Sequence, residues 1–453
     1  MTTDTMRRRA RFCAFAISAA LGSSALAATP DPLADQVAAL LKRVDSLEAD
    51  VKRLTTQNEA LSAQQDRQGE RIESTASAPS QLENLSIWGY GETYYARPEK
   101  GSSDTTSDLA RAVFGIGYRF DERTRFDSEF EVEHAIASAD DEGEMEVEQF
   151  YVDHMLSNHV GLQAGLFLMP VGLLNEHHEP TAFYGVKRNF VETLIVPSTW
   201  REGGLGLHGD TREGIVWNVG VTTGLNFSEW EFNLEDPPYA TALGLVNTDV
   251  APLQAGHQEL QLANSQHLAQ YAMVAYRGIP GLEVGAFGFT GNAAVPDQPA
   301  NAGGQRVTLW EGHVRWTPGD ADFSALYARG TISDTGAYNL ANVGGSNLMP
   351  ASFDGCYMQG AYTVWKRNAY RLTPFVRWED YDMASSYHGV PEGFSPIPTG
   401  PTSTGDPWPR PNDRVWTIGA NLFVTEHVVF KADYQWYENN DFDSFDLGLG
   451  VSF

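Results

Sequence analysis

From about residue 84 to the last residue, apolar and polar residues alternate with a period of two, in segments of about ten residues. The final segment shows the pattern most clearly, and its apolar positions are Phe445, Leu447, Leu449, Val451 and Phe453. Successive side chains of a β-strand point to opposite faces, so each segment has one apolar and one polar face. Strands of this length with one face suited to lipid and one to water are typical of membrane-spanning β-barrels.

The segments number sixteen, and the connections between them alternate in length. We expect strands at about residues 84–96, 109–120, 123–134, 146–156, 158–168, 203–211, 214–226, 267–278, 281–290, 305–317, 321–330, 356–367, 371–381, 413–424, 427–438 and 443–453. Even-numbered strands end in tight turns, such as Asp121-Glu122 and Thr425-Glu426, whereas several odd-numbered strands end in long connections. This alternation, with an even strand count, is the rule for outer-membrane barrels. The sequence therefore predicts an all-β fold, a 16-stranded antiparallel transmembrane β-barrel with both of its ends on the short-turn side.

The N-terminal segment has the features of an export signal. Four arginines within residues 7–11 precede the apolar run 12–21 and the small residues of Ala25-Leu26-Ala27. A basic start, a short apolar stretch and small residues before the cleavage point indicate a secretory signal peptide at residues 1–27. A membrane anchor is the alternative, but a membrane-spanning helix needs about 20 apolar residues.

A heptad repeat follows the signal. Residues 31–73 place Val or Leu at most a and d positions, with Asn58 and Gln65 as polar exceptions. One helix cannot bury such a seam alone, so we expect an α-helical coiled-coil stalk that oligomerises, and Val at a with Leu at d favours a dimer. A solvated linker helix is the alternative. A Ser/Ala/Pro-rich linker at 74–83 then leads into the barrel domain, 84–453.

The charge is concentrated in the barrel domain. The chain has 31 basic and 59 acidic residues, and residues 1–82 contain equal numbers of each, so the net charge of −28 arises from residues 83–453. Binding to nucleic acid requires basic residues that neutralise phosphates, so we exclude a nucleic-acid partner.

The connection at 169–202 is expected to fold into the barrel. It is long yet rich in apolar residues, such as Phe183, Phe190 and Ile195, that would be poorly placed in water. A barrel of 16 to 18 strands is wide enough for an aqueous channel, and a loop packed against its inner wall would narrow that channel. The polar residues that we expect at the constriction are Glu176, His177, His178, Glu179, Lys187, Arg188, Arg201 and Glu202.

The third expected strand has carboxylates along one face, opposite a largely apolar face. Such a row is costly against lipid, so it should face water in the lumen; a strand extending beyond the bilayer is the alternative. The residues that we expect to face the lumen are Arg125, Asp127, Glu129, Glu131, Glu133, Glu311, Arg315, Arg377, Lys431 and Asp433. Rings of charge set the ion preference of pores, and the acidic excess favours a mild preference for cations.

The run Asn175-Glu176-His177-His178-Glu179 contains residue types that bind transition metals. Adjacent residues seldom point at one ion, however, and the run lacks the helical HExxH spacing of zinc proteases. We therefore favour a polar turn and keep a zinc site at the constriction as a hypothesis. We expect no catalytic residues, no resident metal and no cofactor.

Several motifs resemble the phosphate-selective porin O and P family. They are Trp88-Gly89-Tyr90-Gly91-Glu92, the stretch 165–172, Asn175-Glu176 with Glu179-Pro180, Phe183-Tyr184-Gly185-Val186 and Trp200-Arg201-Glu202-Gly203-Gly204. The resemblance covers roughly residues 84–453 and implies a trimeric 16-stranded porin with a constricting third loop. Some relatives, including dicarboxylate-type porins, also have an N-terminal coiled coil. Members selective for phosphate line the pore with ladders of arginine and lysine, and because this sequence shows no such ladder, phosphate selectivity is not carried over.

These patterns predict an outer-membrane porin through which small hydrophilic solutes or ions diffuse passively. The alternatives are a specific channel for organic or inorganic anions, such as dicarboxylates or phosphate, and a barrel whose stalk tethers the outer membrane. An energised transporter would need a plug in a 22-stranded barrel, and a barrel enzyme is disfavoured because no GxSxG motif is present. We expect the chain in the outer membrane of a Gram-negative bacterium, with its coiled coil in the periplasm. Its partners would be lipid, solutes, further copies in a homotrimer, and the assembly machinery that recognises the terminal Phe453. We expect the trimer in preference to the dimer that the heptad favours, because an interface between barrel walls is far larger than the heptad seam.

Overall fold

The structure is a computed structural model, and it describes residues 42, 43, 45, 48 and 52 and residues 81–453 except 101–104, 136–142, 229, 231, 233–250, 294–303, 346 and 398–407. The chain divides into two units, Met1–Ser80 and Gln81–Phe453. The described residues of the first unit are helical. The predicted signal peptide and most of the predicted coiled coil and linker lie outside the described residues. No described helix is long and apolar enough to cross a membrane.

The second unit is one antiparallel sheet. Its strands are β1 (Leu85–Pro98), β2 (Thr106–Arg119), β3 (Thr124–Glu133), β4 (Met145–Met155), β5 (Val160–Leu168), β6 (Arg201–Asp210), β7 (Ile215–Thr222), β8 (Ala269–Tyr276), β9 (Leu282–Asn292), β10 (Arg306–Trp316), β11 (Ala321–Ile332), β12 (Ser352–Tyr362), β13 (Trp365–Arg367), β14 (Tyr370–Ser386), β15 (Asn412–Thr425), β16 (Val428–Tyr437) and β17 (Ser444–Ser452). Short helical segments are η1 (Gln81–Asn84), the π-helical turn η3 (Val191–Ile195), η5 (Gln254–Gly256) and α2 (Thr335–Ala341).

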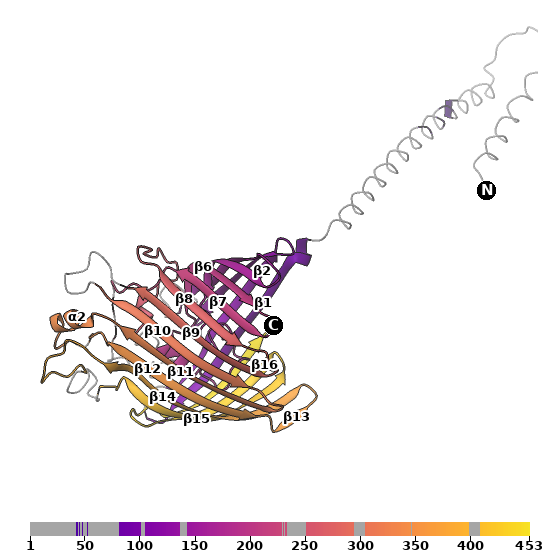
Figure 1. The fold of residues 1–453 in the computed structure, drawn as a ribbon. Coiled ribbons are helices and arrows are strands. Elements are labelled where there is room, and N and C mark those ends of the chain that lie inside the picture. The colour runs from indigo at the N-terminus through magenta and orange to yellow at the C-terminus, as the bar shows by residue number, and fades with distance from the viewer. Residues whose placement is uncertain are drawn as a thin grey trace, which may run out of the picture. The chain divides into compact units, whose positions relative to one another are not determined.

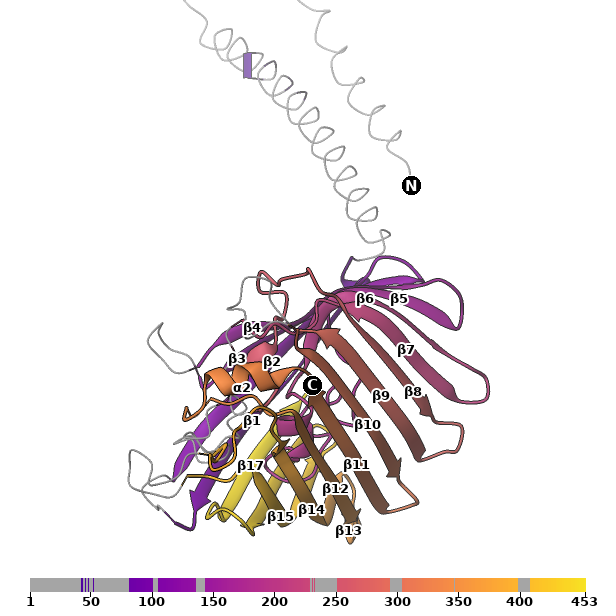
Figure 2. The ribbon, with the colours of Figure 1, turned by 60° about the vertical axis from the view of Figure 1, so that its left-hand side comes forward.

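The sheet closes on itself. Neighbours in the sequence are neighbours in the sheet, and β17 pairs with β1 from Tyr90↔Ser452 to Pro98↔Ser444. The strand β13 has only three residues and shares a place in the wall with β12, since both pair with β14. The structure is therefore a closed 16-stranded barrel, as predicted, and its strands run obliquely around it (Figures 1 and 2).

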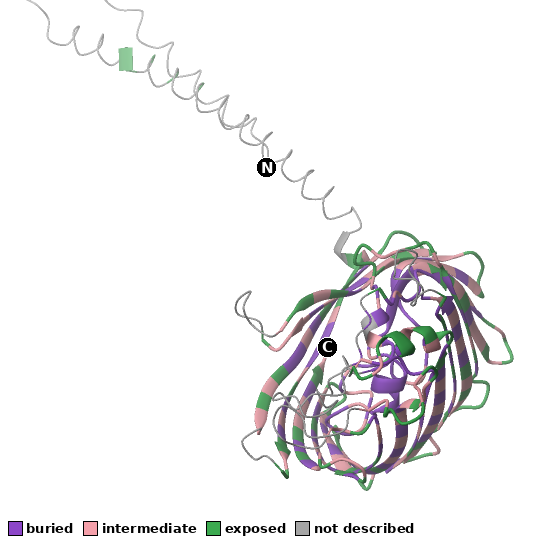
Figure 3. Ribbon diagram, turned by 90° about the vertical axis from the view of Figure 1, so that its left-hand side faces the viewer, coloured by how far each residue is buried: buried purple, intermediate pink, exposed green. Residues whose placement is uncertain are grey.

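The period-two pattern places apolar side chains outside the barrel. Large apolar side chains such as Ile87, Phe114 and Ile418 are half-exposed or more on the outer face, whereas Glu311 and Asp446, on the inner face, are buried. Burial alternates along the strands, and described segments of chain lie inside their ring (Figure 3). An apolar exterior with a polar interior is the pattern of a barrel surrounded by lipid.

Connections on one side of the barrel are short, and the start of β1 and the end of β17 lie on this side. Asp121 organises one of these turns, because its Oδ1 accepts hydrogen bonds from the backbone N–H groups of Arg123 and Thr124, both at 2.8 Å. These bonds lower the pKa of the Asp121 carboxyl.

One predicted strand, 356–367, differs from the structure. The strand β12 ends at Tyr362, and β13 and β14 extend as a hairpin beyond the barrel rim (Figure 1). The ladder is interrupted because the Thr363 N–H donates to the Asp320 carbonyl oxygen of the neighbouring turn, at 2.8 Å, while the Val364 N–H donates to Leu372.

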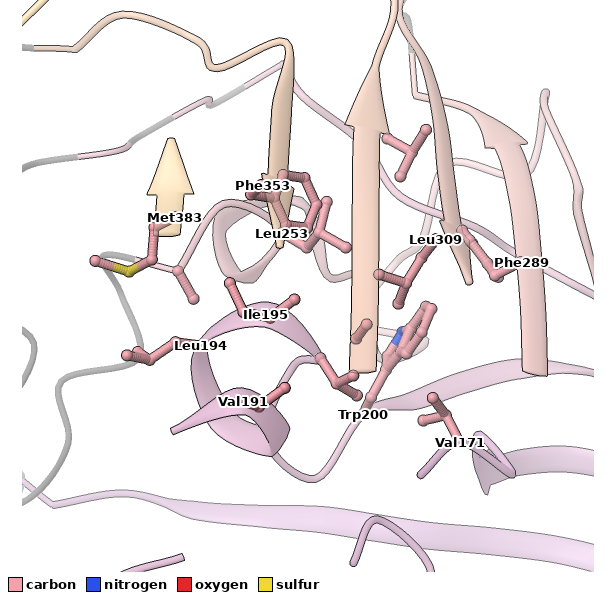
Figure 4. Close-up of a cluster of buried hydrophobic side chains, with 14 of the residues drawn as sticks. Val171, Val191, Leu194, Ile195, Trp200, Leu253, Phe289, Leu309, Phe353 and Met383 are labelled. Carbon is pink, nitrogen blue, oxygen red and sulfur yellow. The ribbon is translucent and has the colours of Figure 1, made fainter. Parts of the chain in front are cut away.

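The third long connection, residues 169–200 between β5 and β6, lies inside the barrel and is called the third loop below. Its buried apolar residues, with others from the connection after β7, pack on the inner faces of β8 to β12 and β14 (Figure 4). The Trp200 ring meets Phe289 edge-on with 4.8 Å between centroids, and Phe190 contacts Tyr381 at 5.6 Å. The apolar content of the loop is thus explained by a core inside the barrel.

Candidate pore site

Buried polar groups hold the third loop in place. Both oxygens of Glu192, within the loop, accept hydrogen bonds, from the N–H groups of Leu173 (2.6 Å) and Leu174 (2.9 Å) and from the Asn189 amide and Tyr357 hydroxyl. An ionised carboxylate has only acceptor sites, so four converging donors suit it.

Inward wall residues anchor the loop backbone as well. The Phe190 N–H donates to Glu379 Oε2 at 2.6 Å, and the Val186 N–H donates to Asp433 Oδ2, also at 2.6 Å. Glu311 accepts from the N–H of Gly172 at 3.3 Å. Two carboxylates expected to face the lumen, Glu311 and Asp433, are therefore used to seat the loop.

Three cavities lie on the two sides of the third loop. The first lies towards the long connections and is called the loop-side cavity; it has a volume of about 440 Å³ and lies against β1 to β4, β16 and β17. Two cavities open towards the short turns, one of about 550 Å³ that includes Arg125, Glu176 and His177, and one of about 290 Å³ that includes His177, Glu179 and Arg315. The Phe183 ring lines both the loop-side cavity and the smaller turn-side cavity.

The loop-side cavity gathers charges of both signs. Its basic side chains are Arg111, Lys187, Arg188, Arg201 and Lys431. Its acidic side chains are Glu92, Glu131, Glu133, Glu144, Glu146 and Glu259. These basic groups come from segments far apart in the chain, so no local run of the sequence shows them together.

Most of these charges are paired. The Arg111 Nε lies 2.8 Å from Glu92 Oε1, Lys187 Nζ lies 3.2 Å from Asp446, and Arg201 pairs with Glu146 and Glu259. The Lys431 Nζ lies 3.4 Å from the centroid of the Phe183 ring, a cation–π contact.

Arg188 places its positively charged guanidinium in the loop-side cavity. Its guanidinium donates to the hydroxyls of Ser198 and Thr199 at 2.9 and 3.0 Å. Burial, with repulsion from Arg111, lowers the pKa of Arg188 to about 10, so the group keeps its charge at neutral pH.

Other residues expected at the constriction have different surroundings. Glu202 is fully buried and accepts hydrogen bonds from Thr223 Oγ1 (2.7 Å) and Trp200 Nε1 (3.2 Å), so its carboxylate is used within the protein. His178 is also buried and contacts Tyr90, and burial lowers its pKa well below the ordinary value.

The remaining residues expected to face the lumen make inward contacts. Arg125 pairs with Asp127 and Asp153, both at 3.2 Å, and Arg377 Nε donates to Glu379 Oε1 at 2.6 Å. Other contacts include Glu129 with Trp88 and Gln149, Glu131 with Arg111, Arg315 with Asp322 and Glu311 with His313.

Sequence reasoning missed Arg111, which is central to the charged wall. In the sheet it lies opposite Glu92 on β1 and Glu133 on β3. An isolated arginine in the middle of a membrane strand is costly against lipid, so the rule applied to the carboxylates of β3 could have found it.

Glu148 was missed for a different reason. The β3–β4 register shifts between Glu129 and Phe130, so that Glu129 pairs with Gln149 and Phe130 with Val147. This β-bulge leaves Glu148 unpaired and turns its side chain into the barrel, where it is fully buried. Strict alternation in the sequence does not reveal a bulge.

Comparisons with known proteins agree with this architecture. No family model matches the chain. The fold is similar to that of Salmonella typhi OmpF, solved with daunomycin, with a TM-score of 0.54, 13% identity, and 82% of this chain and 97% of that chain covered. An anion-selective porin from Comamonas acidovorans matches with a TM-score of 0.47 and 9% identity over 82% of this chain and 99% of that chain.

One relative is more similar to this chain in sequence than these two solved structures are. An uncharacterised protein of Aquifex aeolicus is 30% identical over 360 residues, which are 77% of this chain and 75% of that protein. The similarity to the phosphate-selective porin O and P family stays a prediction. This chain belongs to the same protein family as the uncharacterised Aquifex aeolicus protein.

Proposed function

We propose that the chain is an outer-membrane porin and not an enzyme, and that small hydrophilic solutes or ions diffuse passively through it. The observation that carries this proposal is a closed 16-stranded barrel, apolar outside, with charged cavities on both sides of a loop that lies inside it. Barrels of this size have an interior that can conduct water.

The solute path would follow the charged cavities and pass beside the buried apolar core. A solute would enter the loop-side cavity, pass Phe183 and Lys431, and leave through a turn-side cavity. The third loop would form the constriction, with Lys187, Arg188 and Arg201 at its loop-side mouth.

A channel for organic or inorganic anions, such as dicarboxylates or phosphate, is the second candidate. The five basic side chains around the loop-side cavity favour it, since clustered cations raise the local concentration of anions. The six carboxylates of the cavity oppose it and favour the mild preference for cations that the composition predicts.

Planar-bilayer recording tests both candidates. The chain without residues 1–27 would be refolded in detergent and added to a bilayer, where a porin gives stepwise, ohmic conductance. A barrel that inserts and shows no conductance would contradict the porin proposal. The sign of the reversal potential in a KCl gradient separates a preference for chloride from one for potassium.

We also propose a homotrimer in the outer membrane with its coiled coil in the periplasm. The terminal Phe453 would be read by the assembly machinery, and its backbone exchanges hydrogen bonds with Gly89 at 2.8 and 3.1 Å where the barrel closes. Cross-linking in outer-membrane vesicles would show the number of copies, and deletion of Phe453 should reduce the amount of folded barrel.

A further inference from the structure

Three side chains from three segments meet at the inner face of β3 and β4. Glu129 comes from β3, Glu148 from the bulge in β4 and His178 from the third loop. One ligand atom from each lies within 4.8 Å of the others, and all three side chains are buried. The His178 Nε2 lies 3.5 Å from Glu148 Oε1.

The hydrogen bonds of His178 leave one ring nitrogen facing the carboxylates. Its Nδ1 lies 2.9 Å from the Asn175 carbonyl oxygen, which can only accept, so Nδ1 carries the proton. The Nε2 then presents a lone pair towards Glu148 and the Tyr90 hydroxyl, which is 2.6 Å away. Histidines that bind metals usually donate their other N–H to a carbonyl or carboxylate in this way.

Glu148 has an oxygen without a hydrogen-bonding partner. Its side chain is fully buried, and among the described residues its Oε1 has no hydrogen-bond partner. The same holds for Oε1 of Glu131, which lies beside it and is almost fully buried. A buried acceptor without a donor is rare in native proteins, and these two oxygens can be satisfied by a bound ion or by a proton shared between Glu131 and Glu148.

The local charges are also out of balance. Glu129, Glu131 and Glu148 are buried within one cluster. The arginine beside them is Arg111, but it lies 3.9 Å from Glu131 and is closer to Glu92, at 2.8 Å. Arg188 and Arg201 also attract Glu131, but Arg201 pairs with Glu146 and Glu259. Buried carboxylates need a paired charge or a metal, and among the described residues no arginine or lysine lies within 4.0 Å of the carboxylates of Glu129 and Glu148.

We propose that Glu129, Glu148 and His178 form a site for a divalent transition-metal ion of the zinc type. An imidazole with carboxylates suits such ions better than Ca²⁺ or Mg²⁺, which prefer oxygen ligands only. Bonds of about 2.1 Å in a tetrahedral site place neighbouring ligands about 3.4 Å apart, close to the spacing of His178 Nε2 and Glu148 Oε1. The metal would replace the contact between Tyr90 and His178 and fasten the third loop to β3 and β4.

This site refines the metal hypothesis drawn from the run 175–179. The adjacent histidines separate in the structure, since His177 lines the turn-side cavities and His178 is buried against the wall. The ligands that join His178 come from β3 and β4, which no local motif could indicate.

The test is metal binding by the whole barrel in detergent, measured without channel recording, so its outcome is separate from the porin proposal. After EDTA treatment, calorimetric titration with Zn²⁺ should show one ion per chain, and Ca²⁺ and Mg²⁺ should bind far more weakly. Glu148→Gln and His178→Gln should weaken Zn²⁺ binding at least about 100-fold, because each removes a ligand. His177→Gln, the matched control from the same run, should bind Zn²⁺ as the wild type does.

A fourth variant keeps the test decisive if the ligand variants fail to fold. Tyr90→Phe retains the ring and removes the hydroxyl that competes for His178 Nε2, so it should bind Zn²⁺ more tightly than the wild type. Absence of Zn²⁺ uptake at micromolar concentrations by the wild type would overturn the proposal. So would uptake that persists in both ligand variants, unchanged affinity in Tyr90→Phe, or equal uptake of Ca²⁺.

Discussion

Replacing Glu192 with glutamine should loosen the third loop without opening the barrel. Each carboxylate oxygen accepts two hydrogen bonds, and one of them takes both the Leu173 and the Leu174 N–H. In Glu192→Gln an NH₂ group replaces one oxygen and meets two donors, so two bonds are lost. Each buried donor left unsatisfied costs about 1–3 kcal/mol of stability. The Tyr357 hydroxyl can turn and relieve part of this loss, so the third loop should lose roughly 2–4 kcal/mol of local stability in total.

Hydrogen exchange followed by mass spectrometry measures this loss directly. Each 1.4 kcal/mol of local stability corresponds to about a tenfold change in exchange rate, so peptides covering the third loop should exchange roughly 30- to 1,000-fold faster. Strand peptides should be unchanged, because the barrel ladder does not depend on this carboxylate. Glu122→Gln, in an exposed turn, is the matched control. Equal exchange of the loop in Glu192→Gln and the control would refute the argument that this carboxylate holds the loop.

Three further outcomes are expected. Phe183→Ala removes a ring that lines two cavities and should increase single-channel conductance, while Ile418→Ala on the outer face should leave conductance unchanged; equal values would argue against a path past the ring. Arg188→Gln removes a cation from the loop-side cavity and should shift the reversal potential in a KCl gradient towards potassium, and a shift towards chloride would contradict its role. Gly330→Ala would place its Cβ 2.0 Å from a buried phenylalanine ring, whereas nothing lies within 4 Å of a Cβ at Gly288. The first substitution should cost about 1–3 kcal/mol by denaturant unfolding, well above the cost of the second, and equal costs would show that the core absorbs the methyl group.

The strand pattern could be predicted from the sequence because it depends on local rules. In each of the sixteen strand positions of the barrel wall, successive side chains point alternately to the lipid and to the lumen, and the sequence shows this alternation over about ten residues. The short β13 hairpin was not predicted, since the break after Tyr362 depends on a hydrogen bond from Thr363 to Asp320 in another turn.

The candidate site was only partly predictable. The apolar residues of 169–200 indicated a loop inside the barrel, but not the wall on which it packs. Seating depends on pairs far apart in the chain, such as Val186 with Asp433, whose separation is 247 residues. Glu202 was expected at the constriction because it is charged, yet its hydrogen bonds to Trp200 and Thr223 hold it inside the protein.

The apolar core and the charged cavity inside the barrel differ in how freely their residues can change among related chains. The apolar core formed by the third loop against β8 to β12 and β14 is close-packed, and a change of one methyl group there alters the fit of the loop. The loop-side cavity, against β1 to β4, β16 and β17, is bounded by charges, and exchanges of charge there leave that core untouched. Related chains could therefore keep one barrel and one seated loop while their solutes change, with most of the variation on a single side of the wall. An alignment of relatives should show this asymmetry as conserved apolar positions on one set of strands and variable charges on the other.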